Sequence, residues 1–321
     1  MPQKHCLKIL KNIGDKTMIN EQERNLLEFA ENLNIVVLKN EPMAKHTTFK
    51  IGGRADFFIT VDTEEKLAEL IKFLHKNVID YHIIGNGSNL LVADENIHKV
   101  IIQTTAKKDK IKLIDNTTIY AFAGVFLPQL CDFALENALT GLEFACGIPA
   151  KLGGAIYMNA AAYGSDMSMI LKEIYYIDET GHKQKISAND AQFGYKNSIF
   201  MHKKYAITSA LLELQSCNKE QITNKMQELL TKRRNSQPLE LPNAGSVFRR
   251  PEGHFAGRLI EECGLKGRRV GQAMVSEKHA GFIVNLGGAK CLEVFELIKI
   301  IQDEVRQKKG IKLETEVEYL Y

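Results

Sequence analysis

The order of strand-like and helix-like segments constrains the fold of this chain most strongly. In the first third, hydrophobic periodicity predicts helices over residues 19–34 and 62–77, the second capped by Asp62. Apolar segments bounded by turn residues predict strands at 54–61, 81–84, 90–93 and 99–105. This part of the chain is expected to form a small mixed lobe.

The rest of the chain mixes the two kinds of element in the same way. It contains hairpin-like segments at 111–124 and 173–186, the latter turning at Thr180 and Gly181, and a strand at 205–215. We expect helices over 127–139, 218–234 and 292–309, the last ended by Gly310, and a final strand over 311–320. Hairpins without a sustained βαβ rhythm favour an α+β fold over a doubly wound sheet.

Composition excludes several classes of protein. A chain of 321 residues is long enough for two or three packed lobes. Its 42 Lys and Arg against 39 Asp and Glu give a net charge of +3, which argues against a general nucleic-acid coat or a polybasic membrane anchor. No apolar run approaches the roughly 20 residues of a membrane span or resembles a signal peptide.

The six cysteines form no C-x-x-C pair and no cluster with zinc spacing, so we expect no metal site. Most lie in apolar or helical stretches, which is typical of reduced core residues. Together with the missing signal peptide, this predicts a cytoplasmic protein.

The loop from Gly85 to Leu90, sequence GNGSNL, matches neither common nucleotide motif. The dinucleotide fingerprint needs a third glycine where Leu90 stands and a helix after it, and the NTPase phosphate loop needs a Gly-Lys-Ser/Thr run. Glycine nonetheless allows successive backbone N–H groups to form a nest for phosphate oxygens, with Ser88, Asn86 and Asn89 as further donors. The alternative is a tight turn between two strands.

Two more glycine-rich segments change this balance. Residues 147–164, GIPAKLGGAIYMNAAAYG, have small side chains that let the backbone approach a flat ligand, although a close helix contact would also use them. Residues 46–58 carry a Gly pair that enters a strand. Three such clusters suit an elongated ligand between two lobes, such as FAD, although their composition alone does not distinguish FAD from NADPH.

Together these segments resemble the UDP-N-acetylenolpyruvoylglucosamine reductase family. The motifs HTTFKIGGRADFF, GNGSNLLV, GIPAKLGGAIYMNAAAYG, FGYKNSIF, NAGSVFRRPEGHFAGRLIEECGLKG and LETEVEYL follow in the expected order over roughly residues 20–320. The short gap between FGYKNSIF and NAGSVF looks like the compact family form that lacks an extra substrate-covering loop.

The resemblance implies a two-lobed FAD-binding module like that of vanillyl-alcohol oxidase, plus a C-terminal α+β substrate lobe. The expected divisions are an N-terminal helical extension at 1–45, FAD-binding lobes at 46–106 and 107–217, and a substrate-binding domain at 218–321. It also implies that the loop Gly85, Asn86, Gly87, Ser88, Asn89 and Leu90 holds the FAD diphosphate. The flavin side would be lined by Gly124, Gly147, Ile148, Pro149, Gly153, Gly154, Asn159 and Ala160.

The implied reaction is the reduction of an enolpyruvyl ether on UDP-N-acetylglucosamine, in which NADPH reduces FAD and the flavin passes hydride to the vinyl carbon. This is a step of peptidoglycan precursor synthesis. Charge then builds on the pyruvyl carboxylate, and a proton must reach the neighbouring carbon. Ser246 matches the family's proton donor, Glu316 its carboxylate near the substrate acid, and Lys196 the position where the family usually has arginine.

Each of these three residues has an alternative interpretation. Ser246 would otherwise be a loop serine that opens a strand. Glu314, Glu316 and Glu318 alternate as on a solvated strand face, and Glu314 is the fallback if the register shifts. Lys196 is expected to stabilise charge with help from a water or Tyr195, because lysine lacks the two-pronged geometry of arginine.

We predict that substrate is held by Arg234, Asn243, Arg249 and Arg250, with Arg258, Lys266 and His279 as weaker candidates. The expected partners are a UDP-sugar and NADPH, with no nucleic acid and no membrane insertion. One rival is another FAD oxidoreductase of the same fold that acts on an alcohol or sugar. A more remote rival, supported only by the basic helix 218–234, is a non-catalytic nucleotide- or RNA-binding protein.

Overall fold

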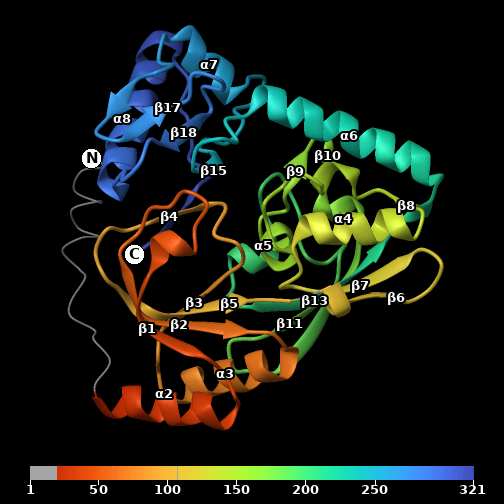
Figure 1. Cartoon of the computed structure of the whole chain (residues 1–321). Helices are drawn as coiled ribbons and strands as arrows, with labels where there is room; N and C mark the ends of the chain where they lie inside the picture. The colour runs from red at the N-terminus through yellow and green to blue at the C-terminus, as the bar shows by residue number, and fades with distance from the viewer. Residues whose placement is uncertain (1–19, 107) are drawn as a thin grey trace.

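The structure is a computed structural model that describes residues 20–106 and 108–321. These residues form three lobes, each built on its own sheet (Figure 1). Strands pair mainly within a lobe and helices pack on the sheet faces, which confirms the α+β prediction.

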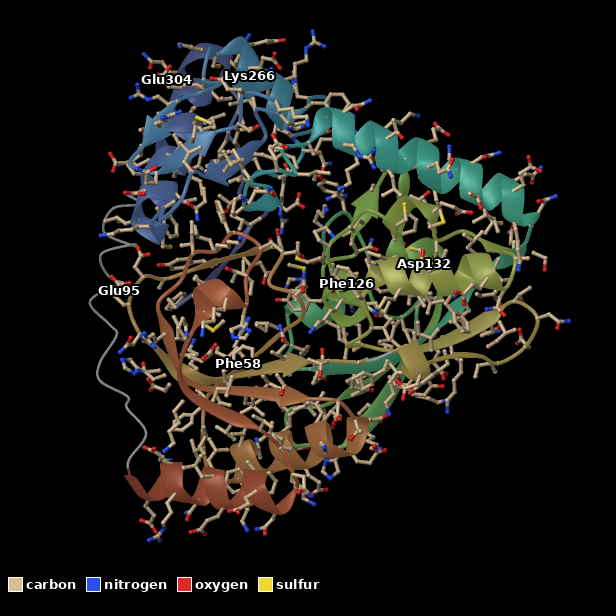
Figure 2. All side chains as sticks on the ribbon, in the orientation of Figure 1. Phe58, Glu95, Phe126, Asp132, Lys266 and Glu304 are labelled. Atoms are coloured by element: carbon tan, nitrogen blue, oxygen red, sulfur yellow. The ribbon has the colours of Figure 1, made fainter. Side chains whose placement is uncertain are left out.

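The first lobe has a four-stranded sheet in the order β1-β2-β5-β3, in which β1 is antiparallel and the other neighbours are parallel. Its strands are β1 (Val37–Pro42), β2 (Arg54–Val61), β3 (Tyr81–Ile84) and β5 (Ile97–Thr104). Helices α2 (Asn20–Asn32) and α3 (Glu64–Lys76) bury their apolar faces against it. Phe58 is fully buried inside this lobe (Figure 2).

Helix α3 begins one residue later than predicted. Thr63, and not Asp62, is the N-cap: its backbone is extended and its hydroxyl oxygen accepts a hydrogen bond from the Lys66 N–H at 3.2 Å. The Asp62 carboxylate lies 3.2 Å from the Lys66 ammonium instead. Asp and Thr can both cap a helix, so the position at which the chain leaves β2 determines which of the two is the N-cap.

The second lobe has a five-stranded antiparallel sheet in the order β12-β11-β13-β7-β6. Its strands are β6 (Ile111–Leu113), β7 (Thr118–Phe122), β11 (Leu171–Ile177), β12 (Lys183–Ser187) and β13 (Ala206–Glu213). Helices α4 (Leu127–Glu136) and α5 (Leu152–Tyr157) pack on one face, and both predicted hairpins are confirmed. Two short pairs complete it: β8 (Leu139–Thr140) with β14 (Gln215–Ser216), and β9 (Ala161–Ala162) with β10 (Ser165–Asp166).

The third lobe follows the long helix α6 (Lys219–Ser236), which runs from the second lobe to the third (Figure 1). Its antiparallel sheet has the order β15-β18-β17-β16, with β15 (Asn243–Ser246), β16 (Arg269–Val270), β17 (Ala273–Val275) and β18 (Phe282–Asn285). Helices α7 (Ala256–Glu262) and α8 (Cys291–Lys309) cover it. Gly310 ends α8 in the left-handed conformation, with φ of 70°, as predicted.

A parallel pair, β4 (Leu90–Val92) with β19 (Glu318–Leu320), joins the first and third lobes. The predicted strand over 311–320 is therefore too long. Before residue 318 this segment has a different partner, because the Glu316 N–H donates to the Val247 carbonyl at 2.8 Å and the Arg249 N–H to the Glu314 carbonyl at 2.8 Å. The chain changes partners midway, so only its last three residues form the strand.

The segment before residue 46 adds β1 to the first sheet, and the domain boundaries after residues 45, 106 and 217 stay predictions. No helix in the described part of the chain combines the length and apolar character that crossing a bilayer requires.

Candidate active site

A cavity of about 1310 Å³ lies where the three lobes meet. Most of the predicted site residues line it: Gly85, Asn86, Gly87, Ser88, Asn89, Leu90, Gly147, Ile148, Pro149, Gly153, Gly154, Ala160, Lys196, Arg234, Asn243, Ser246 and Glu316. A second hollow of about 690 Å³ adjoins it and shares Lys196, Ser246, His279 and Glu316. Pockets for one small ligand are typically about 300–1,000 Å³, so the combined space suits two ligands that meet at these residues.

The Gly85–Leu90 loop is a nest of unused donors and not a hairpin turn. Its flanking strands do not pair with each other, since β3 pairs with β5 and β4 with β19. Within the described chain, the backbone N–H groups of residues 86–89 donate to no protein acceptor. Gly87 has φ of +61°, and a Cβ there would lie 2.2 Å from the His46 carbonyl oxygen, so only glycine fits. Such a nest suits an anion such as a diphosphate.

The 147–164 segment forms the neighbouring wall. The Asn86 side-chain amide donates to the Pro149 carbonyl at 2.7 Å, which joins the wall to the loop. Within α5, a Cβ at Gly153 would lie 2.9 Å from the Ala123 Cβ, whereas one at Gly154 would meet no protein atom within 4 Å. Gly153 therefore serves packing, and Gly154 leaves open space that a bound group can enter.

Lys196 and Glu316 form an ion pair between the second and third lobes. The Lys196 Nζ lies 2.8 Å from the Glu316 Oε1, and the two side chains are only 14% and 11% exposed. The interpretation of Glu316 as part of a solvated strand face is therefore wrong. Asn89 of the loop donates its side-chain amide to the Glu316 carbonyl at 3.1 Å, so the nest and the ion pair share one framework.

Lys196 is held in a left-handed backbone conformation, with φ of 51°. Reciprocal backbone hydrogen bonds between Gly194 and Asn197, at 3.1 and 3.2 Å, close the turn around it. The buried Asn159 donates its side-chain amide to the Gly194 carbonyl at 3.0 Å. Residues kept in such conformations by several contacts are frequent at functional sites.

Ser246 ends β15 beside the ion pair. Its hydroxyl donates to the Phe248 carbonyl at 3.2 Å, and the next residue, Val247, accepts the Glu316 N–H. Ser246, Lys196 and Glu316 thus all line both the cavity and the second hollow. The chain folds residues from three distant motifs into this single cluster.

The other predicted residues lie elsewhere. Gly124 packs against the Thr105 backbone, and a Cβ on Gly124 would lie 2.5 Å from it. The cavity lining does not include Gly124, Asn159 or Arg249. Arg250 and Arg258 line the second hollow, where the Arg250 guanidinium stacks 3.9 Å from the Phe255 ring centroid. Lys266 pairs with Glu261 at 2.6 Å on the outer part of the third lobe (Figure 2).

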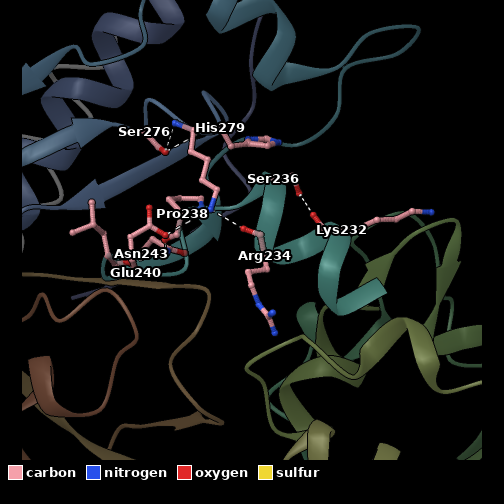
Figure 3. A network of polar contacts seen from close by, with 10 residues as sticks. Lys232, Arg234, Ser236, Pro238, Glu240, Asn243, Ser276 and His279 are labelled. Carbon is pink, nitrogen blue, oxygen red and sulfur yellow. Dashed lines mark hydrogen bonds and ion pairs between the residues drawn. The ribbon is translucent and has the colours of Figure 1, made fainter. Parts of the chain in front are cut away.

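The end of α6 is tied to the third lobe by a polar network (Figure 3). The Lys278 ammonium donates to the Arg234 carbonyl at 2.7 Å and lies 3.8 Å from a Glu240 carboxylate oxygen, which places a cation at the helix C-terminus. The Arg234 side chain points away from this network (Figure 3) and lines the cavity. The Asn243 side-chain amide donates to the Leu241 carbonyl at 2.8 Å, so this side chain shapes the loop.

Several cavity residues had no role predicted from the sequence, among them Lys151, Tyr157, Arg233 and Glu318. Arg233 packs over Gly147, and its position beside Arg234 was the only available signal. Glu318 was expected on a solvated face. Instead it is hydrogen-bonded to Tyr157, and burial raises the pKa of its carboxyl, partly offset by that bond and by Arg249.

The raised pKa of Glu318 predicts a pH effect on stability. A carboxyl with a higher pKa in the folded state binds more protons there, so the free energy of unfolding should fall as pH rises from the ordinary value of 4.5 through the raised pKa. Glu318→Gln should remove this part of the pH dependence and stabilise the protein at neutral pH. Urea unfolding at several pH values, with exposed Glu314→Gln as control, tests this. A steeper pH dependence in Glu318→Gln would contradict it.

The described residues contain no group of three His, Cys, Asp or Glu side chains that would hold a metal ion. The site offers a nest of N–H donors, an open glycine-lined wall and a charged pair beside a hydroxyl, features that suit an organic ligand. A dinucleotide in the larger cavity fits these residues, because its diphosphate would meet the nest and its flat ring the wall.

Comparisons with known proteins agree with this arrangement. Residues 55–187 match the FAD binding domain family, and residues 237–320 match the C-terminal domain of UDP-N-acetylenolpyruvoylglucosamine reductase. The chain is 45% identical over 293 residues to the protein of that name from Carboxydothermus hydrogenoformans, covering 91% of this chain and 97% of the relative. The protein of that name from Listeria innocua is 43% identical over 289 residues, covering 89% and 96%.

A solved structure extends the likeness to the fold. The crystal structure of UDP-N-acetylenolpyruvylglucosamine reductase from Thermus caldophilus superposes with a TM-score of 0.76 at 34% identity, covering 89% of this chain and 99% of that one. Together with the FAD-binding match, it confirms the predicted fold class, an FAD-binding module of two lobes followed by a C-terminal α+β lobe.

Proposed function

Because the chain belongs to the UDP-N-acetylenolpyruvoylglucosamine reductase family, we propose that it reduces the enolpyruvyl ether of UDP-N-acetylglucosamine enolpyruvate with NADPH. The product is UDP-N-acetylmuramate, a peptidoglycan precursor. FAD, when bound, carries hydride between NADPH and the vinyl carbon of the substrate. The observation that carries this proposal is the cluster of Lys196, Glu316 and Ser246 in the space next to the FAD-binding loop.

The cofactor residues follow from the walls of the cavity. The unused N–H groups of the Gly85–Leu90 loop would receive the diphosphate, with the Asn86 amide already fixed on Pro149. The flavin side would be lined by Gly147, Ile148, Pro149, Gly153, Gly154 and Ala160. We assign Gly124 and Asn159 indirect roles, because Gly124 packs on Thr105 and Asn159 holds the turn of Lys196.

The charged pair addresses the hardest part of the reaction. Hydride addition to the vinyl carbon leaves negative charge on the neighbouring carbon and the pyruvyl carboxylate. The Lys196 ammonium has N–H groups beyond the one directed at Glu316, and these would bind that carboxylate as its charge grows. Glu316 fixes the direction of the Lys196 ammonium. This fixed direction would compensate for the missing bidentate geometry of an arginine.

Ser246 would then donate the proton. A hydroxyl is a weak acid, so its donation requires a fixed position close to the carbon that becomes basic. The bond from its hydroxyl to the Phe248 carbonyl and the pairing of Val247 with Glu316 support such a position.

The nucleotide part of the substrate would occupy the second hollow. Arg250 lines it, and Arg234 lines the adjoining cavity, so both guanidinium groups would meet the UDP diphosphate. Asn243 would shape the loop around Ser246, since its side-chain amide donates to the Leu241 carbonyl. Arg249 would act indirectly through its charge, which partly offsets the rise that burial causes in the pKa of the Glu318 carboxyl.

We infer that the reaction takes place in the cytoplasm, where NADPH and nucleotide sugars are present. The cysteines within the described residues form no disulfide, in keeping with a reducing compartment.

The absorption spectrum tests the proposed function. The purified protein should be yellow, NADPH should bleach the flavin band without oxygen, and the enolpyruvyl nucleotide should then restore it with formation of the lactyl ether. Bleaching by an alcohol or sugar, without restoration by the enolpyruvyl nucleotide, would favour a different flavin oxidoreductase.

The open space at Gly154 makes a second prediction about the cofactor. In Gly154→Ala the methyl group meets no protein atom, so the apoprotein should be as stable as the wild type or slightly more stable. It would enter the space of the flavin, and overpacking of about 1–3 kcal/mol corresponds to about 5- to 150-fold weaker FAD binding. Flavin titration of the apoprotein measures this.

Gly153→Ala is the matched control. Its methyl group would contact the Ala123 Cβ, so it should lower the melting temperature of the apoprotein itself. Unchanged FAD affinity in Gly154→Ala would show that the cofactor does not pass over this glycine.

A further inference from the structure

Lys151 lies in the glycine-rich wall without an assigned role. Its backbone is fixed on both sides, by a bridge to Phe126 and by the start of α5 at Leu152, whose N–H donates to the Val125 carbonyl at 2.8 Å. The side chain therefore leaves a rigid base, and it is part of the cavity lining.

The ammonium of Lys151 has N–H groups available for a ligand. It donates to the Thr104 carbonyl at 2.7 Å, which uses one of its three N–H groups. In the described part of the chain, Lys151 forms no ion pair with a carboxylate. Burial lowers the pKa of this group to about 8, and no neighbouring charge contributes to that shift. A half-buried cation without a counterion is costly unless an anion binds beside it.

The position of Lys151 identifies the anion it would meet. A Cβ on Gly85, the first residue of the nest, would lie 3.6 Å from the Lys151 Cβ. The acceptor of the lysine, Thr104, follows Gln103, whose side-chain amide donates to the Gly85 carbonyl at 2.8 Å. Lys151 and residues 86–89 thus line the same cavity, and the lysine lies next to the first residue of the nest.

We propose that Lys151 binds the diphosphate of FAD together with the Gly85–Leu90 loop and so determines the affinity of the protein for its cofactor. The diphosphate is the only anionic part of FAD, and a point charge beside a nest of N–H groups complements it. This inference deepens the proposed function and rests on it only for the identity of the cofactor. It assigns Lys151 no part in the reduction.

The test is FAD binding to apoprotein prepared from the wild type and from Lys151→Met. Loss of a hydrogen bond to a charged group should weaken FAD binding about 10- to 150-fold. Riboflavin lacks the diphosphate, so its affinity should be the same in both proteins. Lys151→Arg should retain most of the FAD affinity, and Lys112→Met, on the exposed edge strand β6, controls for the loss of one positive charge.

The outcomes separate this inference from the proposed function. Equal FAD affinity in Lys151→Met and the wild type would overturn the proposed role of Lys151. An equal loss of affinity for FAD and riboflavin would also overturn it, because it would indicate a purely structural role. If Lys151→Met does not fold, Lys151→Gln and the ³¹P resonances of bound FAD give the same comparison. Failure of the enolpyruvyl nucleotide to react would refute the reductase activity while leaving the FAD measurements unaffected.

Discussion

Ser246→Ala should abolish most of the turnover by slowing one half of the reaction only. Reduction of the bound flavin by NADPH needs no proton donor to the substrate carbon, so its rate should match that of the wild type. Reoxidation by the enolpyruvyl nucleotide should slow by about 10²- to 10⁴-fold, the usual contribution of a positioned general acid. Anaerobic stopped-flow absorbance at the flavin band separates the two halves.

The matched control is Ser236→Ala, which removes a hydroxyl bonded to the Lys232 carbonyl on the surface of α6. Ser246→Cys, which keeps an acidic proton at the same place, should recover part of the lost rate. If both half-reactions slow equally in Ser246→Ala, the serine supports the site only structurally. A wild-type rate of flavin reoxidation in Ser246→Ala would show that the serine is not the proton donor.

Backbone features that depend on local chemistry were predictable from the sequence. Gly87 of the loop, Gly153 of the 147–164 segment and Gly310 at the end of α8 each have a conformation or a close contact that few residue types permit. Such requirements are visible in a short stretch of sequence, whatever the rest of the chain does.

The parts that depend on which segments meet were not predictable from periodicity. Glu314, Glu316 and Glu318 look alike in the sequence, yet Glu314 is exposed, Glu316 pairs with Lys196 and Glu318 is half-buried beside Tyr157. The difference arises because this segment changes partners from residues 247–249 to β4. Lys151 escaped notice for the same reason, since only the packing of the first lobe against the second brings it to Gly85.

The Lys196–Glu316 pair should behave as a single unit in mutational analysis. Lys196→Met and Glu316→Gln should each slow reoxidation by the enolpyruvyl nucleotide by about 10²- to 10³-fold, the cost of removing one preorganised electrostatic contact. Because each residue acts through the other at 2.8 Å, the double variant should be little worse than either single variant. FAD should stay bound in all three.

Two comparisons show whether charge or geometry matters at this position. Lys196→Arg keeps the positive charge and adds the fork that suits a carboxylate, so it should retain far more activity than Lys196→Met. Lys172→Met breaks an ion pair of the same length, 2.8 Å to Glu213, but on the exposed surface, and should leave turnover unchanged. Wild-type turnover in Lys196→Met would refute the assignment. Multiplicative losses in the double variant would mean that the two residues act separately, with Glu316 contacting the substrate itself.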